Sequence, residues 1–576
     1  MKKLLLGNEA VARGLYEAGV HVVSSYPGTP STEITEYAAE YNEIYTEWAP
    51  NEKVAAEAAF GASQAGGRSF CGMKHVGLNV AADPLFTASY IGVTGGFVIG
   101  VADDPGMHSS QNEQDSRHYA IASKMPMLEP SDSAECKEFT KLAYELSEQF
   151  DTPVYLRLVT RIAHSRSLVE INERQEVALK KYEKNQAKNI MLPAFARQKH
   201  PIVEQRTLDL QEYAESSAIN RVELGGTGIG IICAGSAYCY AKEALGEEAS
   251  YLKLGMVYPL PVKLIKDFAA KVEKLYVIEE LDPIIENHCR QIGVEVIGKE
   301  LFPLCGEFTQ ATVKAAILGQ KEESLSVEAQ IPPRPPALCS GCPHRGVFYI
   351  LKKLGVFVSG DIGCYTLGAA APLFAIDTNL CMGSSISALH GVNKANPEFQ
   401  DKAVAVIGDS TFLHTGINSL INVAYNRSNS VSIILDNSIT GMTGHQQNPA
   451  TGYNIKGEPA NAICLEDLCR SVGINSVVVV DPYNLEELER VLKEELAKDE
   501  PSVIITRRPC VLLKYVKPNP PLYVNKEKCK SCKACMRIGC PAISFKGGKA
   551  EIDRTLCVGC GVCVAMCKFD SIGGEA

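Results

Sequence analysis

The chain has 576 residues and a mass of 62.3 kDa, which corresponds to about four domains of roughly 150 residues each. Charged residues make up 22% and hydrophobic residues 46%, so a disordered or fibrous chain is excluded. The net charge of -10, without a lysine- or arginine-rich block, argues against nucleic acid as a partner. We find no apolar run of about 18 residues and no signal-peptide pattern, so we expect a cytoplasmic protein that has no membrane partner.

Two elements near the start of the chain surround a rigid turn. Residues 10–19 have a helical pattern, and residues 21–25 form a strand-like apolar stretch. The segment Tyr26-Pro-Gly-Thr-Pro-Ser31 follows directly. Prolines on both sides of Gly28-Thr29 predict a fixed turn at the end of the strand.

Three further segments of this region are candidate functional sites. Glu52 lies at the predicted start of a helix, where the helix dipole favours a carboxylate whatever its function. Residues 73–79 and 102–117 are dense in polar groups within apolar surroundings, and such loops commonly carry function. A lone histidine is more often structural, yet three side chains here are candidates for substrate contact or acid–base work: His75, His108 and Arg117.

The middle of the chain contains a connector and a second α/β region. Residues 166–222 are charged and weakly periodic, which predicts a helical connector. The segments 229–235 and 275–280 are strand-like, so we expect an α/β domain around them. The glycine-rich segment 226–230 precedes the first of these strands instead of following it, which argues against a dinucleotide-binding fingerprint.

Two proline-rich linkers, residues 331–336 and 517–521, bound a third region. Within it, residues 403–407 form a predicted strand that ends in Gly408-Asp409-Ser410, and residues 431–435 form another that ends in Asp436-Asn437. The carboxyl ends of parallel strands line a ligand crevice, so Asp409 and Asn437 are expected to converge there. An ordinary Rossmann-type turn is the alternative.

Such a pair of oxygen ligands suits Mg²⁺, which binds carboxylate and amide oxygens together with ligand phosphates. The expected further ligand of the Mg²⁺ ion is therefore a diphosphate. Gly408 would allow the backbone to approach that diphosphate closely.

Eight of the 21 cysteines lie between Cys529 and Cys567. Disulfides are uncommon in a large cytoplasmic chain, so dense thiols indicate metal. Two runs follow the bacterial ferredoxin pattern, in which the last cysteine of each run ligates the other 4Fe–4S cluster. The predicted ligand sets are Cys529, Cys532, Cys535 and Cys567 for one cluster, and Cys557, Cys560, Cys563 and Cys540 for the other.

Two alternatives remain for this tail. Four residues instead of three precede Cys540, which also fits a labile or three-iron cluster. A pair of structural zinc sites would use the CxxC spacing as well.

Another cysteine group is distributed over the third region: Cys339, Cys342, Cys364 and Cys510. Beside a βαβ region, the alternatives to a metal site for the pair Cys339-x2-Cys342 are a redox dithiol and two buried small hydrophobic side chains.

The segments at Gly408-Asp409-Ser410 and Asp436-Asn437 resemble the thiamine diphosphate motif of the 2-oxoacid:ferredoxin oxidoreductases. That motif normally reads Gly-Asp-Gly and Asn-Asn, so Ser410 and Asp436 are departures from it. Segments 389–391, 394–397 and 440–446 are also similar to this family. Segments 26–30, 74–79 and 342–345 resemble its indolepyruvate branch, in the large subunit, and the similarity extends over nearly the whole chain.

The resemblance implies roles for particular residues. Glu52 would bond the thiamine aminopyrimidine and Thr29 would face the substrate. Asp409, Asn437 and the carbonyl of Ile439 would ligate Mg²⁺, with Gly408, Ser410 and His344 also at the cofactor. The family places a third 4Fe–4S cluster beside the thiamine, here on Cys339, Cys342, Cys364 and Cys510.

The implied fold class is a multidomain α/β thiamine diphosphate-binding fold with parallel sheets and a C-terminal two-cluster ferredoxin-like α+β domain. Its expected parts are a pyrimidine-binding domain (1–165), the helical connector (166–222), a transketolase C-terminal-like domain (223–325), a diphosphate- and Mg-binding domain (326–520) and the ferredoxin-like domain (521–576).

The implied activity is oxidative decarboxylation of aryl pyruvates, above all indolepyruvate, to aryl-acetyl-CoA and CO2, with electrons passed to ferredoxin. The family's γ domain is missing from the chain, which implies a separate small β subunit in an α2β2 assembly. The alternatives are an oxidoreductase for another 2-oxoacid, a non-oxidative thiamine-dependent decarboxylase, and an electron-carrier module with a degenerate thiamine fold.

Overall fold

The structure is a computed structural model that describes residues 1–321, 329–332 and 335–574. The chain divides into two compact units, residues 1–328 and 329–576. The expected domain boundary at 325–326 lies outside the described residues, as do residues 333–334 of the predicted proline-rich linker. In the described part of the chain, no helix has the length and apolar character needed to cross a membrane.

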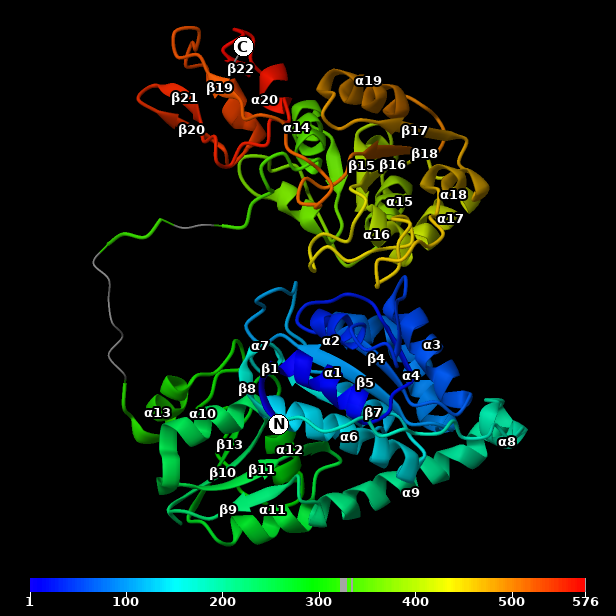
Figure 1. Cartoon of the computed structure of the whole chain (residues 1–576), viewed down its shortest axis with the longest axis vertical. Helices are drawn as coiled ribbons and strands as arrows, with labels where there is room; N and C mark the ends of the chain where they lie inside the picture. Colours follow the sequence, from blue (N-terminus) through cyan, green and yellow to red (C-terminus); the bar gives the residue numbers. More distant parts are fainter. Residues whose placement is uncertain (322–328, 333–334, 575–576) are drawn as a thin grey trace. The chain divides into compact units, whose positions relative to one another are not determined.

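The first unit is built on a seven-stranded sheet of order β12-β6-β7-β5-β4-β2-β3. Figure 1 labels β4, β5 and β7 of this sheet. Its neighbouring strands are parallel, except that β12 is antiparallel to β6. The strands are β2 (Val22–Ser25), β3 (Tyr45–Trp48), β4 (Ser69–Lys74), β5 (Phe97–Asp103), β6 (Met127–Leu128), β7 (Val154–Val159) and β12 (Met256–Tyr258). β4, β5 and β7 are buried along their whole length, as expected of parallel strands covered on both faces.

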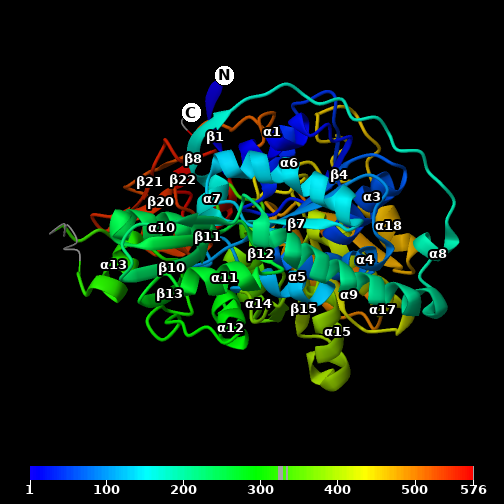
Figure 2. The same cartoon turned by 90° about the horizontal axis from the view of Figure 1, so that it is seen from below.

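Six helices accompany this sheet: α1 (Gly7–Glu17), α2 (Thr32–Ala38), α3 (Glu52–Gln64), α4 (His75–Ile91), α5 (Arg117–Ser123) and α6 (Ser133–Phe150). The views agree that α1 lies along α6 (Figures 1 and 2). Gly14 makes this packing possible, because a Cβ atom there would lie 2.7 Å from the Lys137 carbonyl oxygen and from Thr140 Cβ.

The predicted helical connector is helical only in its second half, in α8 (Gln186–Asn189) and α9 (Pro193–Ser216). Residues 166–170 instead form β8 (Arg166–Glu170), which pairs antiparallel with β1 (Lys2–Leu6) after the short helix α7 (Thr160–His164). The charged side chains of β8 are exposed while Val169 is buried, which is the alternation of an edge strand and not of a helix.

A four-stranded sheet of order β13-β10-β11-β9 completes the first unit. Its elements are β9 (Arg221–Glu223), β10 (Ile229–Ala234), α10 (Gly235–Leu245), β11 (Ser250–Leu254), α11 (Val262–Ala269), β13 (Lys274–Ile278), α12 (Ile284–Gln291) and α13 (Gln310–Leu318). β12, which lies in sequence between β11 and β13, joins the seven-stranded sheet.

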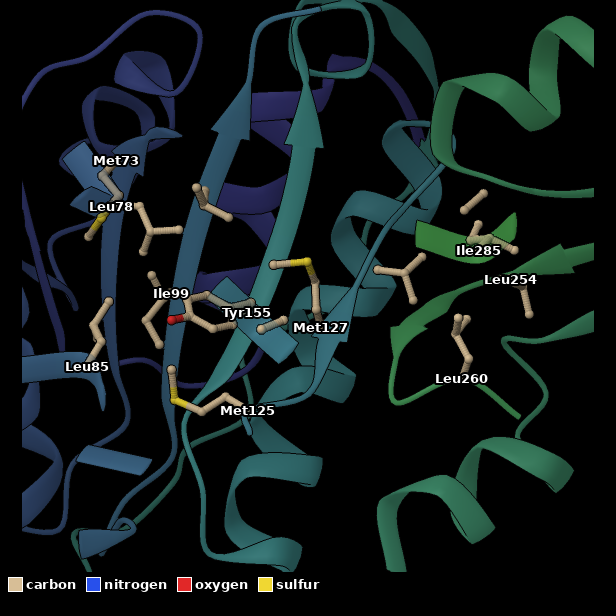
Figure 3. Close-up of a cluster of buried hydrophobic side chains, with 14 of the residues drawn as sticks. Met73, Leu78, Leu85, Ile99, Met125, Met127, Tyr155, Leu254, Leu260 and Ile285 are labelled. Atoms are coloured by element: carbon tan, nitrogen blue, oxygen red, sulfur yellow. The ribbon is translucent and has the colours of Figure 1, made fainter. Parts of the chain in front are cut away.

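The two sheets of the first unit share one hydrophobic core. Figure 3 shows Ile99, Tyr155 and Met127 of the larger sheet, Leu254 of the smaller sheet, and Ile285 of α12, which accompanies the smaller sheet. All five side chains are fully buried in the same cluster. The residues expected to form a separate transketolase C-terminal-like domain are therefore packed as part of one body with residues 1–165.

The second unit contains a five-stranded parallel sheet of order β14-β15-β16-β18-β17. Its elements are α14 (His344–Leu354), β14 (Phe357–Ser359), α15 (Ser385–Ala395), β15 (Ala403–Gly408), α16 (Asp409–Thr411), α17 (Ile417–Tyr425), β16 (Val431–Asp436), α18 (Leu465–Ser471), β17 (Ser476–Val480), α19 (Leu485–Leu496) and β18 (Ser502–Arg507). β15 and β16 are direct neighbours with Gly408 opposite Leu435, so their carboxyl ends lie side by side.

The C-terminal part of this unit is small and contains little regular structure. Its elements are β19 (Tyr523–Val524), β20 (Ile543–Lys546), β21 (Lys549–Ile552), α20 (Val562–Ala565) and β22 (Ile572–Gly573). The core of this part consists largely of cysteines and short apolar side chains, and Tyr349 and Tyr483 of the parallel-sheet part pack against it. The cysteine-rich tail is therefore docked onto the parallel-sheet part of the second unit.

Candidate cofactor and cluster sites

Three oxygen-bearing groups meet where β15 and β16 end: the Asn437 amide, the Ile439 carbonyl and the Asp409 carboxylate. One terminal atom of the Asn437 amide lies 2.8 Å from the Ile439 carbonyl oxygen and 3.2 Å from Asp409 Oδ1. Oxygens this close need either a donated hydrogen, which a reversed Asn437 amide would supply, or a cation between them. Carboxylate, amide and carbonyl oxygens are the donors that Mg²⁺ prefers, so the residues present fit a magnesium ion.

The Asp409 carboxylate lies in surroundings that favour a cation. Its side chain is buried, and burial together with the nearby Asp436 carboxylate raises the pKa of Asp409 to about 7. The Ser410 backbone N–H donates to Asp409 Oδ1 at 2.8 Å, which offsets this only in part. A bound divalent ion would favour the ionised form of this carboxyl.

The two departures from the thiamine motif have local partners. The Ser410 hydroxyl accepts a hydrogen bond of 2.9 Å from Thr440. Asp436 accepts a 2.6 Å hydrogen bond from Arg507, whose guanidinium also pairs with Glu466 at 2.7 Å. Asp436 is thus held by a salt bridge next to the three-oxygen site.

Gly408 is needed for a reason that we did not expect. A Cβ atom at this position would lie 2.6 Å from Cε1 of Tyr365, so the aromatic ring already occupies the space beside the strand end. The close approach of a diphosphate to Gly408 stays a prediction. His344 is buried with its ring centroid 6.0 Å from that of Tyr365, and burial lowers the pKa of His344 to about 4. His344 thus packs against Tyr365 near Gly408, and its place at the cofactor stays a prediction.

The four cysteines of the proposed third cluster lie near enough for their thiols to affect one another's pKa. Burial and the neighbouring Cys510 and Cys339 raise the pKa of Cys364 to about 11. Burial likewise raises the pKa of Cys342 to about 12, with Cys339 and Cys364 among the neighbours that add to the shift. Such mutual effects require the thiols to lie close to one another.

This cysteine group adjoins the three-oxygen site. A Cβ atom on Gly441 would lie 3.4 Å from Cys364 Sγ and 3.6 Å from the Asn437 amide nitrogen, so a single glycine separates the two. Asp361, which we did not single out, holds the loop before Cys364. Its carboxylate accepts backbone N–H groups of Gly383 at 2.8 Å and Ser385 at 3.0 Å. Its position just after β14 could have identified it, by the same strand-end rule that identified Asp409.

The tail cysteines fall into the two predicted groups. Four of them line one cavity: Cys540, Cys557, Cys560 and Cys563. Burial raises the pKa of Cys535, and its thiol neighbours include the remaining three, Cys529, Cys532 and Cys567. Within the described ranges, no three His, Cys, Asp or Glu side chains converge closely enough to hold a single metal ion.

In the first unit, Glu52 begins α3 and is 4% exposed. Asn51 caps this helix by accepting the Val54 backbone N–H at 2.9 Å, which fixes the start of the helix at Glu52. A Cβ atom on Gly77 would lie 2.5 Å from Glu52 Oε1, so a side chain at Gly77 would displace the carboxylate.

Lys74 was not singled out in the sequence, and it lies among the candidate residues. Burial lowers the pKa of Lys74 to about 8, although the nearby Asp104 and Glu52 carboxylates raise it. Lys74 Nζ donates to the Ser109 carbonyl oxygen at 3.1 Å, and the Ser109 hydroxyl donates to the Thr29 carbonyl oxygen at 3.2 Å. A signal was available, since Lys74 is the last residue of a central parallel strand.

His75 follows directly and is 1% exposed. Its Nε2 lies 3.2 Å from the Asn112 carbonyl oxygen, and its buried Nδ1 has no hydrogen-bond partner among the described residues. Burial lowers the pKa of His75. Thr29, Glu52, Lys74 and His75 therefore form one candidate site within the first unit.

The structure places Arg117 and His108 elsewhere. Arg117 is fully buried and donates to Asp115 and Glu279 at 2.6 Å each, as well as to two backbone carbonyls after β13. This network occupies the guanidinium, so the geometry favours a structural role for Arg117 over substrate binding. His108 is half exposed and lies 3.2 Å from Glu307.

Three family models match the sequence. "Pyruvate flavodoxin/ferredoxin oxidoreductase, thiamine diP-bdg" matches residues 13–218, and "Thiamine pyrophosphate enzyme, C-terminal TPP binding domain" matches residues 361–506. The model "4Fe-4S dicluster domain" matches residues 521–568. The predicted fold class is confirmed, and the match favours iron–sulfur clusters over zinc in the tail.

Relatives match over nearly the whole length. The "Indolepyruvate oxidoreductase subunit IorA" of Archaeoglobus fulgidus is 42% identical, with 99% of this chain and 97% of the relative covered. The proteins of the same name from Pyrococcus horikoshii and Methanothermobacter thermautotrophicus are 41% and 39% identical, covering 99% and 100% of this chain and 96% and 97% of the relatives.

Proposed function

The chain belongs to the family of indolepyruvate oxidoreductase subunit IorA, and we propose that it oxidatively decarboxylates aryl pyruvates, above all indolepyruvate. It is a thiamine diphosphate-dependent 2-oxoacid:ferredoxin oxidoreductase with an iron–sulfur domain. The proposed reaction consumes the 2-oxoacid, coenzyme A thiol and two oxidised ferredoxins. It yields the aryl-acetyl thioester, CO2, one proton and two reduced ferredoxins, so atoms and electrons balance.

We propose residues for this chemistry in each unit, taken separately. Thiamine diphosphate, when bound, supplies the electron-accepting carbon chemistry that 2-oxoacid decarboxylation requires. In the second unit, Asp409, Asn437 and the Ile439 carbonyl would hold the Mg²⁺ that binds its diphosphate. In the first unit, Glu52 would bond the aminopyrimidine and hold the proton that this ring exchanges.

Residues around Glu52 complete the proposed site of the first unit. Lys74 is a buried cation beside two carboxylates, and it lies next to the turn that carries Thr29. A buried ammonium suits the carboxylate of an incoming 2-oxoacid. His75 would keep its ring neutral at physiological pH, because burial lowers its pKa.

The observation that supports an oxidative reaction is the contact between the third cysteine group and the three-oxygen site. The Cys510 backbone N–H donates to the Asn437 carbonyl oxygen at 2.9 Å. A cluster on Cys339, Cys342, Cys364 and Cys510 would thus lie beside the diphosphate end of the cofactor. A non-oxidative decarboxylase needs no electron acceptor at that position.

The proposed partners follow from this reaction and from the family. A separate small β subunit would complete an α2β2 assembly, and ferredoxin would accept electrons from the two tail clusters. Coenzyme A and the 2-oxoacid are the small-molecule substrates.

The test is an anaerobic preparation of the chain together with its small subunit. We expect reduction of a viologen dye that depends on both indolepyruvate and coenzyme A, with 2-oxoglutarate as the comparison substrate. Release of aldehyde without dye reduction would indicate the non-oxidative decarboxylase instead. Dye reduction with 2-oxoglutarate but not with indolepyruvate would contradict the proposed aryl pyruvate substrate. A chain without bound thiamine diphosphate would favour the electron-carrier module.

A further inference from the structure

Arg345 is a buried cation that lies between two cysteine groups. It is the second residue of α14 and is 4% exposed. One terminal nitrogen, Nη2, donates to the Cys339 carbonyl oxygen at 3.0 Å and to the Leu338 carbonyl. The other, Nη1, donates to the Ile538 carbonyl oxygen at 3.1 Å and to the Gly539 carbonyl. The guanidinium therefore joins the Cys339–Cys342 loop to the segment directly before Cys540.

The thiols around Arg345 belong to both groups. Burial lowers the pKa of Arg345, and four cysteines oppose this shift: Cys540, Cys342, Cys339 and Cys560. Arg345 and Cys342 also line the cavity that the four thiols of one tail group share. The buried Arg345 Nε has no hydrogen-bond partner in the described part of the chain, so one N–H donor of the guanidinium is not used by the two loops.

The two cysteine groups are in close contact where Gly341 meets Val558. A Cβ atom on Gly341, which has a φ of +70°, would lie 2.2 Å from Cγ2 of Val558. Val558 lies between Cys557 and Cys560, and Gly341 lies between Cys339 and Cys342. The Tyr483 hydroxyl donates to the Gly341 carbonyl and so fixes the loop from the other side.

We propose that Arg345 is a positioning residue that fixes these two cysteine loops against each other and raises the reduction potential of the cluster on Cys540, Cys557, Cys560 and Cys563. The inference rests on the iron–sulfur clusters of the proposed function. A cluster becomes more negative when it is reduced, and a fixed positive charge nearby stabilises that form, the more so in a site of low dielectric. Hydrogen bonds and charge near the sulfurs are established determinants of cluster potential.

The test compares three variants of the anaerobic holoenzyme by redox titration followed by electron paramagnetic resonance. Arg345→Met removes the charge, and Arg345→Lys keeps the charge but loses the fork that joins the two loops. Arg537→Met is the matched control, because Arg537 is an exposed arginine next to Ile538 and its charge is screened by water. The relevant signal is identified as the one lost in Cys560→Ala.

We expect Arg345→Met to shift the reduction equilibrium of this cluster at least tenfold toward the oxidised form, which is about 59 mV for one electron. Arg345→Lys should shift it less, and Arg537→Met should leave it unchanged, with iron content equal in all. If Arg345→Met loses iron, Arg345→Gln, which also removes the charge, decides in its place, and a potential equal to that of the wild type then overturns the inference. Equal potentials in all variants at full iron content also overturn it, whereas a wild-type enzyme without these clusters overturns the proposed function and this inference with it.

Discussion

The backbone N–H of Cys510 donates a 2.9 Å hydrogen bond to the carbonyl oxygen of Asn437. Cys510 follows β18 and Asn437 follows β16, and these strands are neighbours in the parallel sheet. The sheet thereby places a candidate cluster ligand directly beside a candidate Mg²⁺ ligand. A cluster on Cys510 would therefore lie beside the diphosphate site, where it would accept electrons from the cofactor.

Replacing Cys364 tests the third cluster. We expect Cys364→Ala to lower the iron content by about four atoms per chain, because a 4Fe–4S cluster needs its four thiolates. Indolepyruvate-dependent dye reduction should be lost while the two tail clusters keep their signals. Cys381→Ala is the matched control, since Cys381 is an exposed cysteine in the same part of the fold. Unchanged iron in Cys364→Ala would remove the third cluster from the proposal.

Substitutions of the neighbouring carboxylates Asp409 and Asp436 test which of the two binds Mg²⁺. Asp409→Asn should weaken Mg²⁺-dependent binding of thiamine diphosphate by more than about tenfold, because it removes the charged oxygen of the three-oxygen site. Asp436→Asn changes the same chemical group next door, where the partner is Arg507, and should change this affinity only a few-fold. Calorimetric titration of the two variants measures both effects. Equal losses would mean that Asp436 is a ligand as well.

The strand ends of the second unit were predictable from the sequence. Residues 403–407 and 431–435 were expected as strands, and the structure has β15 and β16 at Ala403–Gly408 and Val431–Asp436. Short apolar runs bounded by Gly-Asp and Asp-Asn leave little freedom in the assignment. The convergence of Asp409 and Asn437 then follows from the geometry of parallel strands alone.

The surroundings of these residues were not predictable, because they come from distant segments. The Tyr365 ring that fills the space beside Gly408 lies 43 positions earlier in the chain. Arg117 has a polar loop context that suggests function, and only the fold shows that Glu279 neutralises it. The sequence predicts a helix at residues 166–170 because this segment is short and charged. The structure has β8 there, and this strand forms by pairing with β1, which lies 160 residues earlier in the chain.

Magnesium binding should depend on pH through Asp409. The pKa of this carboxyl rises from 3.8 to about 7 in the metal-free fold, so below pH 7 each Mg²⁺ must displace a proton. The Kd for Mg²⁺ should rise about tenfold per pH unit below 7 and level off above it.

The raised pKa of Asp409 also makes the stability of the fold depend on pH, in a direction that can be stated. Between pH 3.8 and about 7 the folded chain binds a proton at Asp409 that the unfolded chain has lost, so the metal-free fold becomes less stable as pH rises through this range. Asp436→Asn removes a nearby negative charge and should move the inflection of Mg²⁺ binding to lower pH. An inflection that stays in place would show that another group titrates.

Gly77→Ala tests the position of the Glu52 carboxylate without changing Glu52. The new Cβ would lie 2.5 Å from Oε1, so the carboxylate must move, and we expect kcat/KM to fall about 100-fold with cluster content unchanged. Gly61→Ala is the matched control on α3, where a Cβ meets nothing within 4 Å and should leave activity unaltered. Glu52→Ala should abolish turnover while cluster absorbance persists. Full activity in Glu52→Ala would contradict the site.

Arg117 distinguishes a structural network from a substrate contact. Arg117→Met would leave the buried Glu279 without its guanidinium partner and Asp115 with only the more distant Arg157 at 3.8 Å, and we expect the free energy of unfolding to fall by about 3–5 kcal/mol. Arg161→Met is the control, because the 58% exposed Arg161 pairs with Glu307 at the surface and should cost at most about 1 kcal/mol. Urea denaturation followed by circular dichroism measures both. A raised KM for indolepyruvate with unchanged stability in Arg117→Met would instead assign Arg117 to the substrate.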